Sequence, residues 1–452
     1  MNARSVGHVR RPIASIAIVA ALLFAGCAYS LISGGKINET HASAVETGIQ
    51  QIRQLSFKTH VPVVLKNPDE VEQMVLDDLK RDYTDDQIDA DGKAGSMLGL
   101  FPPGMDLKAQ TVKLLKSQIA GFYDPHTKQM VLVQGLNDTT VPDRMLEFAV
   151  QRDLVNDMLL AHELTHALQD QNYGLQDNLD KLKDNSDEEL ALKSVAEGDA
   201  TISGFAYVAG RMDNSIADTL TSHLKDLPET FAAQSKGTPE GLSTPLIFQY
   251  SDGVRFVSEA YKRGGWKAVD ALYLKPPLST QQIIDPSLYF DHPIAPIAVS
   301  VDGYQSMLKD WSKIDEDTFG ELSIQLILQQ GYSKNAPQVA VAKRWAGDRM
   351  AILKRGPDVA VIWIAAFHDD ESANQFEDAY RIMLDRTRAN VPHSVERRGN
   401  AVLVITGAIT NQSATLGPAV WKASTIGKQP STPIWPPLKI EAAGSEGLAS
   451  AR

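Results

Sequence analysis

Two histidines and a glutamate lie close together in an apolar stretch of the chain, at His162, Glu163 and His166. On a helix, side chains four positions apart share one face, so both imidazoles can bind one metal ion. Glu163 then lies about 100° further round the helix, where it can take a proton from a water molecule on that metal. Burying these polar groups in an apolar helix is costly unless they have a partner. The pattern predicts metal-assisted hydrolysis, with Glu163 as the catalytic general base and zinc (Zn2+) as the metal.

A third ligand must come from elsewhere, since catalytic zinc normally binds three protein groups and keeps one position for water. The chain has ten His in all, and none follows soon after His166, so we expect a carboxylate. Glu197 is the preferred choice, because it lies in a predicted helix among small and apolar residues, where a carboxylate needs a cation. Glu188 and Glu189 are alternatives, although a first helical turn suits acidic residues without a metal. The predicted metal ligands are His162, His166 and Glu197.

Two segments resemble the gluzincin group of zinc metallopeptidases, to which thermolysin belongs: 161–171, which contains the histidine pair, and 196–200. More narrowly, the chain resembles a bacterial family with a Gly-Phe/Tyr-Tyr-Asp-Pro hairpin upstream, here 121–125, and a Ser-Thr-Gln/Glu-Gln segment downstream, here 279–282. The resemblance implies a zincin-like fold and peptide-bond hydrolysis. It implies the same zinc ligands and base, namely His162, His166, Glu197 and Glu163.

The chain departs from this pattern beside the third ligand. In thermolysin-like enzymes an Asp one turn after the ligand Glu orients a histidine, whereas this chain has Thr201 there. Asp199, two residues after Glu197, is a candidate for orienting a ligand, and capping or a structural salt bridge is the alternative role. Hydrolysis also needs a group that stabilises the developing oxyanion. The downstream candidates for it are Tyr250, Tyr261, His223 and His292.

The N-terminal sequence is typical of an exported lipoprotein. Basic residues precede an apolar run from Ile13 to Ala25 that is short for a membrane span, as in a secretory signal. Residues 23–27 resemble a bacterial lipobox, in which Cys27 becomes the lipidated first residue. Cys27 is the only cysteine, so it has no disulfide partner in the chain. We expect a cell-envelope protein, in the outer membrane facing the periplasm if the host is Gram-negative; a free cysteine or an uncleaved anchor is the alternative.

Charge and length limit the classes of partner. The 452 residues carry a formal net charge of -12, which argues against a nucleic-acid partner. The hydrophobic fraction of 43% and the charged fraction of 22% are those of an ordinary globular protein with room for more than one core. The expected partners are a peptide or protein substrate and the lipid bilayer, bound through lipidated Cys27.

The patterns predict an α+β protein, in which a mainly helical zincin-like domain with a small β-sheet edge precedes a small α+β C-terminal domain. The predicted division is a signal peptide at 1–26, a lipid-anchored tether at 27–67, the metallopeptidase domain at 68–307, the C-terminal domain at 308–425, and a disordered tail at 426–452.

Individual elements follow from periodicity, caps and turn residues. Helices are expected at 68–82, 106–117, 142–174, 186–200, 249–263, 319–330 and 371–388. Strands are expected at 350–354, 359–364 and 401–405, and a hairpin at 119–133. In HExxH peptidases a strand beside the metal helix commonly receives substrate by strand addition, so this hairpin is a candidate substrate edge.

Two functions compete with hydrolysis. One is a non-catalytic zinc-binding envelope lipoprotein that uses a degenerate peptidase scaffold to bind a partner. The other is a surface module whose C-terminal domain binds envelope polymers. A structural zinc site would need a fourth protein ligand in place of water, which separates the first rival from an enzyme.

Overall fold

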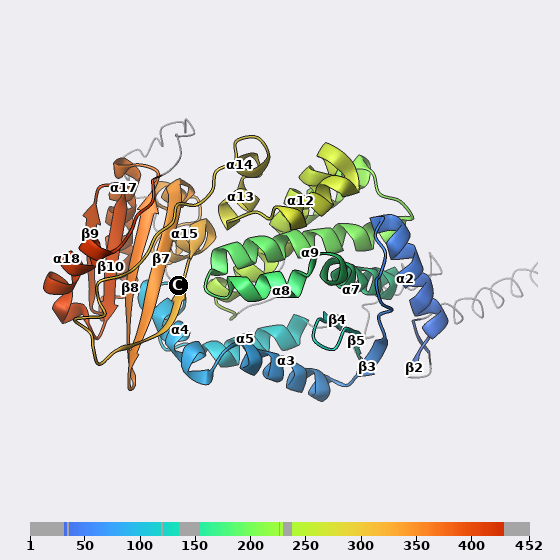
Figure 1. Ribbon diagram of the computed structural model, residues 1–452, viewed down its shortest axis with the longest axis horizontal. Helices are drawn as coiled ribbons and strands as arrows, with labels where there is room; N and C mark the ends of the chain where they lie inside the picture. Colours follow the sequence, from blue (N-terminus) through green and yellow to red (C-terminus); the bar gives the residue numbers. More distant parts are fainter. Residues whose placement is uncertain are drawn as a thin grey trace, which may run out of the picture. The chain divides into compact units, whose positions relative to one another are not determined.

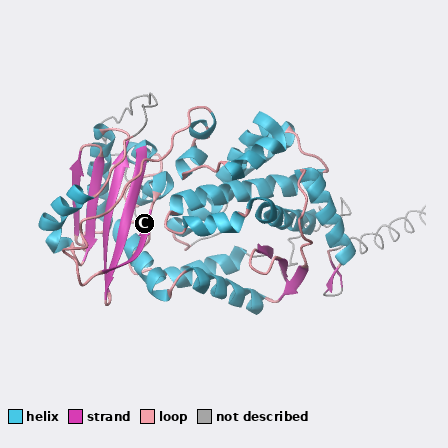
Figure 2. Cartoon of the chain, viewed as in Figure 1, coloured by secondary structure: helices cyan, strands magenta, loops and turns pink. Residues whose placement is uncertain are grey.

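The computed structural model describes residues 31–33, 36–118, 121–134, 154–225, 227–228 and 237–428. The predicted signal peptide at 1–26, Cys27, the start of the helix predicted at 142 and residues 429–452 lie outside the described residues. The fold is α+β, as predicted: helices predominate, a small sheet lies among them, and a larger sheet forms in the C-terminal region (Figures 1 and 2).

The chain forms two compact units, each made of several segments. Unit 1 comprises residues up to Val71, Ile119–Asn172 and Ser203–Met212; unit 2 comprises Glu72–Gln118, Tyr173–Ile202 and the chain from Asp213 onward. These units do not coincide with the predicted domains, because residues 68–307 contribute to both.

Unit 1 contains a three-stranded sheet of order β3-β5-β4. Strands β4 (Gly121–Asp124) and β5 (Gln129–Val133) are antiparallel, so the predicted hairpin is confirmed. Asp124 shapes its turn, since Oδ1 accepts hydrogen bonds from the amides of His126 and Thr127. Strand β3 (Val63–Lys66), which the sequence analysis missed, pairs in parallel with β5.

Much of the predicted tether is folded, and the prediction of a tether over 27–67 is wrong for this part. Helix α2 (Glu39–Arg53) begins after Asn38, whose side chain accepts a hydrogen bond from the His41 amide. Its apolar positions Ala42, Val45 and Ile49 have helical spacing and are buried in the core of unit 1. These positions form a short amphipathic pattern in a segment that is otherwise rich in small and polar residues.

The middle of the chain is helical. The helices are α3 (Pro68–Asp82), α4 (Asp85–Leu98), α5 (Leu107–Gln118), α7 (Leu154–Tyr173), α8 (Leu175–Leu179), α9 (Ser186–Ala209), α10 (Asn214–Leu224), α12 (Glu240–Leu274), α13 (Thr280–Ile284) and α14 (Ser287–Phe290). Gly264 and Gly265, predicted to end a helix, instead form a kink within α12, where Gly265 has φ 63°. Residues 175–185, between the helices predicted at 142–174 and 186–200, contain α8 and a short 3-10 helix.

The C-terminal sheet has the strand order β6-β7-β8-β10-β9, with every neighbouring pair antiparallel. Its strands are β6 (Ser312–Asp317), β7 (Trp345–Arg355), β8 (Asp358–Phe367), β9 (His393–Arg398) and β10 (Ala401–Gly407), and the helices beside it include α15 (Gly320–Gln329), α17 (Asp370–Thr387) and α18 (Ser413–Ala423). Strands β7, β8 and β10 and helices α15 and α17 were predicted, whereas β6, β9 and α18 were not.

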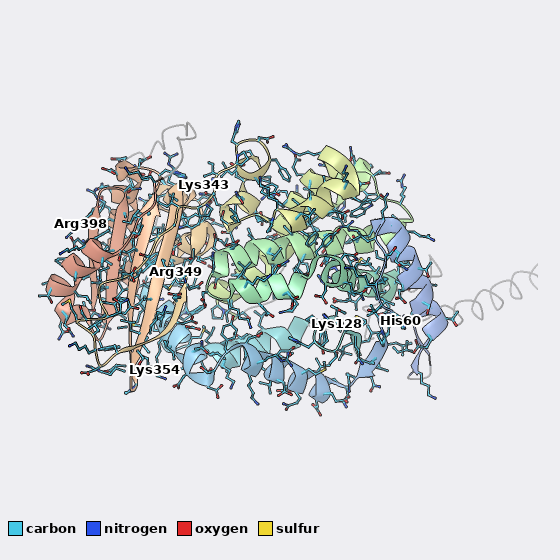
Figure 3. The ribbon with its side chains drawn as sticks, in the orientation of Figure 1. His60, Lys128, Lys343, Arg349, Lys354 and Arg398 are labelled. Carbon is cyan, nitrogen blue, oxygen red and sulfur yellow. The ribbon has the colours of Figure 1, made fainter. Side chains whose placement is uncertain are left out.

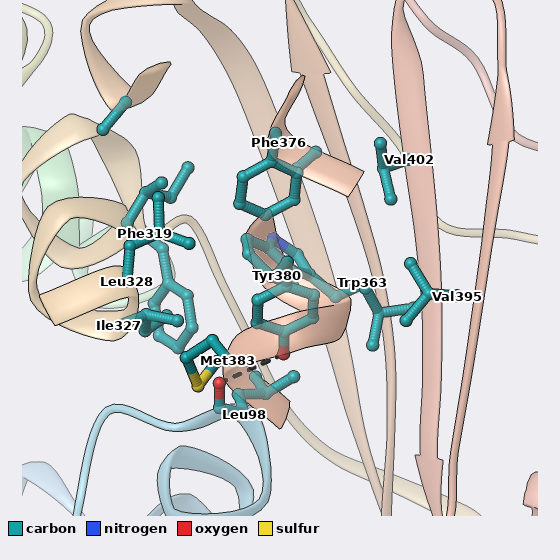
Figure 4. Packing of buried hydrophobic residues seen from close by; sticks show 14 of the residues in the cluster. Leu98, Phe319, Ile327, Leu328, Trp363, Phe376, Tyr380, Met383, Val395 and Val402 are labelled. Atoms are coloured by element: carbon teal, nitrogen blue, oxygen red, sulfur yellow. Dashed lines mark hydrogen bonds between the residues drawn. The ribbon is translucent and has the colours of Figure 1, made fainter. Parts of the chain in front are cut away.

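Helix α4, far away in sequence, completes the core of this sheet. Its buried residues Ala90, Ala94 and Leu98 belong to the same cluster as Trp363 of β8 and Tyr380 of α17. Figure 4 shows the Tyr380 hydroxyl donating a hydrogen bond to the Leu98 carbonyl, at 3.1 Å. The segment 308–425 therefore shares its core with residues 85–98.

The C-terminal sheet region extends slightly beyond the boundaries predicted for the C-terminal domain, 308–425. Ile426, placed in the predicted tail, forms a β-bridge with Val299 and packs against the second face of the sheet. Among the described residues no helix is both long and apolar enough to cross a membrane.

Replacing Leu98 with Ala should lower the free energy of unfolding by about 3 kcal/mol, because the change leaves a cavity in the core that α4 shares with the sheet. Denaturant titration measures this loss. The control Ile382→Ala, at a side chain 43% exposed on α17, should change stability by less than about 0.5 kcal/mol. A loss as small as this for Leu98→Ala would contradict the shared core.

Candidate metal centre

Helix α7 is positioned by an apolar face. Leu160, Leu164 and Leu168 are buried in one cluster with residues of α2 and β5. At helical spacing these leucines form one stripe, which leaves the two histidines on a different side. His162 and His166 are half-buried. Packing of α7 into unit 1 therefore sets the direction in which the imidazoles point.

The two imidazoles face each other as the spacing predicts. Their Nε2 atoms lie 3.2 Å apart, and the ring planes are nearly perpendicular, at 83°. Two nitrogens bound to one tetrahedral zinc at its usual bond length are about 3.3 Å apart. The separation thus suits two ligands of a single ion.

Glu197 completes the group. One ligand atom from each of His162, His166 and Glu197 lies within 4.8 Å of the others, and all three residues are half-buried. Helix α9 carries Glu197, and its last residues, from Ser203, belong to unit 1. There Gly204 lies against α7: a Cβ atom on it would be 2.9 Å from the Met158 carbonyl oxygen.

The alternative ligands have other contacts. The Glu188 carboxylate accepts a hydrogen bond from Asn185, and Glu189 forms an ion pair with Lys193 at 2.7 Å. Neither belongs to the ligand group among the described residues.

Two glycines let α9 and α12 approach closely beside Glu197. A Cβ atom at Gly198 would lie 2.4 Å from the Gly253 carbonyl oxygen, and one at Gly253 would lie 2.3 Å from the Ser194 carbonyl oxygen. Both distances are too short for any side chain, so only glycine permits this crossing. The only local sign of this role for Gly198 is a glycine inside a helical pattern.

Glu163 is held next to the histidines by the edge strand β4. Its Oε2 accepts a hydrogen bond from the Tyr123 amide at 3.0 Å, and its Oε1 lies 4.0 Å from Nε2 of His162. The Tyr123 amide uses the edge of β4 that does not pair with β5. The general-base candidate therefore lies beside the edge of β4 that has no strand partner among the described residues.

A second contact fixes this strand to α7. The Tyr123 hydroxyl donates a hydrogen bond to Asp170 at 3.0 Å, and Lys128, labelled in Figure 3, contacts the same carboxylate at 2.6 Å. Burial, and then the neighbouring Asp170 charge, raise the pKa of Tyr123, so its hydroxyl stays protonated and remains a donor. The hairpin and α7 are thus joined at Glu163 and Asp170.

Gln169 orients one imidazole, and the sequence analysis missed it. Its Oε1 lies 2.9 Å from Nδ1 of His166, and the residue is fully buried. Since the amide oxygen only accepts, Nδ1 carries the proton, and in the neutral imidazole the lone pair is then on Nε2, the atom that faces His162. The spacing of three residues on one helix could have revealed this contact.

Asp199, the candidate for orienting a ligand, lies two residues after Glu197 on α9. It is fully buried, and its Oδ2 accepts a hydrogen bond from the Tyr273 hydroxyl at 2.8 Å. The Tyr273 ring stacks on Tyr173, with centroids 4.6 Å apart. This contact joins α9 to α12.

The candidate oxyanion donors occupy different places. His223 lies at the exposed end of α10 with Nδ1 2.7 Å from the Thr219 carbonyl oxygen, and His292 is exposed; neither belongs to the ligand group among the described residues. Tyr250 and Tyr261 lie on α12, and the Tyr261 ring packs edge-on against Trp266.

The Ser-Thr-Gln-Gln segment forms structural contacts. Ser279 caps α13, and the Gln281 side chain donates hydrogen bonds to the carbonyls of Lys343 and Trp345. Gln282 donates to the Ile294 carbonyl at 2.7 Å. These residues hold α13 against β7 and the loop that follows α14.

Comparison with known families matches one part of the chain. A domain of unknown function (DUF8575) matches residues 306–416. This segment covers most of the C-terminal sheet region and contains none of the residues of the ligand group. Neither the curated proteins nor the solved structures give a match.

Replacing Gly198 with Ala should destabilise the protein by about 2 kcal/mol or more, because the new methyl group collides with the Gly253 carbonyl. In an unhindered helix the same change would stabilise by about 1 kcal/mol. Thermal unfolding therefore distinguishes the two cases by sign, and a stabilised variant would refute the close crossing of α9 and α12.

Proposed function

We propose that this protein is a membrane-anchored zinc metallopeptidase of the gluzincin type, with His162, His166 and Glu197 as zinc ligands. The observation that carries the proposal is the convergence of these three side chains, with Glu163 beside them. Export and a lipid anchor at Cys27 are part of the proposal and rest on the N-terminal sequence. The substrate is a peptide or protein, and the site belongs to the cell envelope.

The donor set suits zinc. Two imidazole nitrogens and one carboxylate oxygen are the ligands of many hydrolytic zinc sites, which keep a fourth position for water. Among the described residues the group contains three ligands and no fourth His, Cys, Asp or Glu. A structural zinc site would need a fourth protein ligand in place of water, so zinc binding has to be measured together with cleavage to separate an enzyme from the non-catalytic zinc lipoprotein.

Glu163 acts as the base. When bound, the zinc would lower the pKa of a water molecule towards about 7 and polarise the scissile carbonyl. The Tyr123 amide holds one oxygen of Glu163, and the other faces the ligand group. Glu163 can therefore accept a proton from the attacking water and pass it to the leaving amine without changing its position.

The edge of β4 that has no strand partner among the described residues would supply a place for substrate. An extended peptide can pair with such an edge through its main chain, which positions a peptide bond without requiring one particular side chain. The Tyr123 amide that holds Glu163 belongs to this edge. A substrate added to β4 would then lie beside the base.

Replacing Glu163 with Gln should abolish hydrolysis of an unstructured protein such as casein while leaving one zinc bound per chain. The Gln side chain can still accept the Tyr123 hydrogen bond but cannot take a proton at neutral pH. Cleavage assays and metal analysis of the same preparation test this. An undiminished rate in Glu163→Gln refutes the base assignment, and wild-type protein that binds zinc but cleaves nothing supports the non-catalytic rival.

Replacing Gln169 with Leu should weaken zinc binding by about 10- to 100-fold, because Nδ1 of His166 loses its acceptor. Competition with a chromophoric chelator measures the affinity. Gln169→Glu retains an acceptor oxygen and should bind zinc more tightly than Gln169→Leu. Equal affinities for these two variants would mean that Gln169 does not orient the ligand.

A further inference from the structure

A fully buried carboxyl group lies in the first turn of α9, the helix that carries Glu197. Asp187 is 2% exposed. Its Oδ1 accepts hydrogen bonds from both the amide and the hydroxyl of Thr280, the former at 3.1 Å. The Thr280 hydroxyl in turn accepts a hydrogen bond from the Leu322 amide at 3.3 Å. Asp187 thereby links α9 to α13 and α15.

The space around Asp187 admits no larger group. Gly320 has φ 71°, which favours glycine, and a Cβ atom on it would lie 1.8 Å from Oδ1 of Asp187. The main chain of this turn is also held: the Asp187 amide donates to the Thr318 carbonyl at 3.2 Å, and the Ser186 amide donates to Asp317 at 2.7 Å. The start of α9 is therefore fixed against β6 and α15 at several points.

The charged groups acting on Asp187 have the wrong sign to stabilise a carboxylate. They are Asp348 on β7 and Glu321 on α15, and Asp317 on β6 lies close enough to act on Asp348. Lys343 acts on Glu321. Asp348 itself accepts four N–H hydrogen bonds, from Phe319, Gly320, Trp345 and Trp363.

The second carboxyl oxygen of Asp187 also indicates that this group is a neutral acid. Oδ2 is buried and has no hydrogen-bond partner among the described residues. A buried carboxylate with one oxygen unbonded and carboxyl neighbours is strongly unfavourable, whereas a neutral acid avoids most of this penalty. Burial raises the pKa of Asp187 well above its ordinary value, which agrees with a neutral group.

We propose that Asp187 is a positioning residue whose neutral carboxylic acid fixes the first turn of α9 and, through that helix, Glu197. Ten residues of α-helix separate the two side chains, a rise of about 15 Å. Helix α9 is continuous from Ser186 to Ala209, so a displacement of its first turn tilts it about the Gly198–Gly253 crossing and reorients Glu197 beside that crossing. This inference rests on the zinc centre proposed above, because Glu197 is there a ligand.

Ionisation of Asp187 would weaken the anchor. A charged Asp187 would repel Asp348 and Glu321 and would draw water into the packed turn. Because the folded pKa is raised, the stability that this group contributes is fully present below a pH of about 4 and is lost as pH rises towards and through the folded pKa. Relative to a variant that cannot ionise at this position, zinc affinity should fall in parallel as α9 loosens.

The test compares Asp187→Asn with Asp187→Leu in the full chain. Asn keeps an acceptor for Thr280 and resembles a neutral acid, so it should bind zinc within about threefold of wild type, while Leu should lose about tenfold or more. Asn cannot ionise. Between pH of about 5 and 9, the unfolding constant of the metal-free wild type should therefore rise relative to that of Asp187→Asn, by at most about tenfold per pH unit.

The outcomes separate the inference from the proposed function. Equal pH dependence in wild type and Asp187→Asn, or zinc binding by Asp187→Asn as weak as by Asp187→Leu, overturns the inference. Failure of wild type to bind zinc overturns the proposed metal centre, while unfolding of the metal-free protein still tests the neutral acid. Glu189→Gln is the matched control, since Glu189 pairs with Lys193 at the helix surface and its loss should leave the pH dependence unchanged.

Discussion

The candidate metal centre depends on one constraint: α7 must bury an apolar face and still give its polar side chains partners. The leucines of this helix pack against α2 and β5, which fixes its rotation about its axis. Gln169 and the Tyr123 amide then hold His166 and Glu163. The two groups that would do chemistry are thus oriented by hydrogen bonds before any metal binds, which is the preorganisation that a hydrolytic site needs.

Helix α9 contributes the third side chain and connects regions that are distant in sequence. Close to Glu197 it crosses α12 at Gly198, and Asp199 bonds to Tyr273 on that helix. At its first turn Asp187 is buried beside the C-terminal sheet. These contacts make the position of one carboxylate depend on packing over the whole length of a helix. They also give the Ser-Thr-Gln-Gln segment a structural role, because Thr280 is the partner of Asp187.

The C-terminal sheet is therefore more than an attached module. It takes α4 into its core and surrounds the start of α9 with buried carboxyl groups. A domain of unknown function matches this region, which agrees with a segment that has a fold of its own. Residues 85–98 lie outside that match and still fill part of its core. The contacts at the first turn of α9 would let this domain hold in place the helix that carries Glu197, which is a more direct use of them than binding envelope polymers.

The sequence by itself determined what depends on local geometry. The four-residue spacing of His162 and His166 placed both imidazoles on one face, because the helical period sets the directions of the side chains, and the Asp124 turn specified the hairpin. The choice of Glu197 followed from the cost of an isolated carboxylate among apolar residues. Only the tertiary structure decided that α4 belongs to the C-terminal core, that β3 joins the hairpin, and that Asp187 is buried. Each of these depends on contacts between residues distant in sequence, and no local pattern records which distant surface will cover a given face.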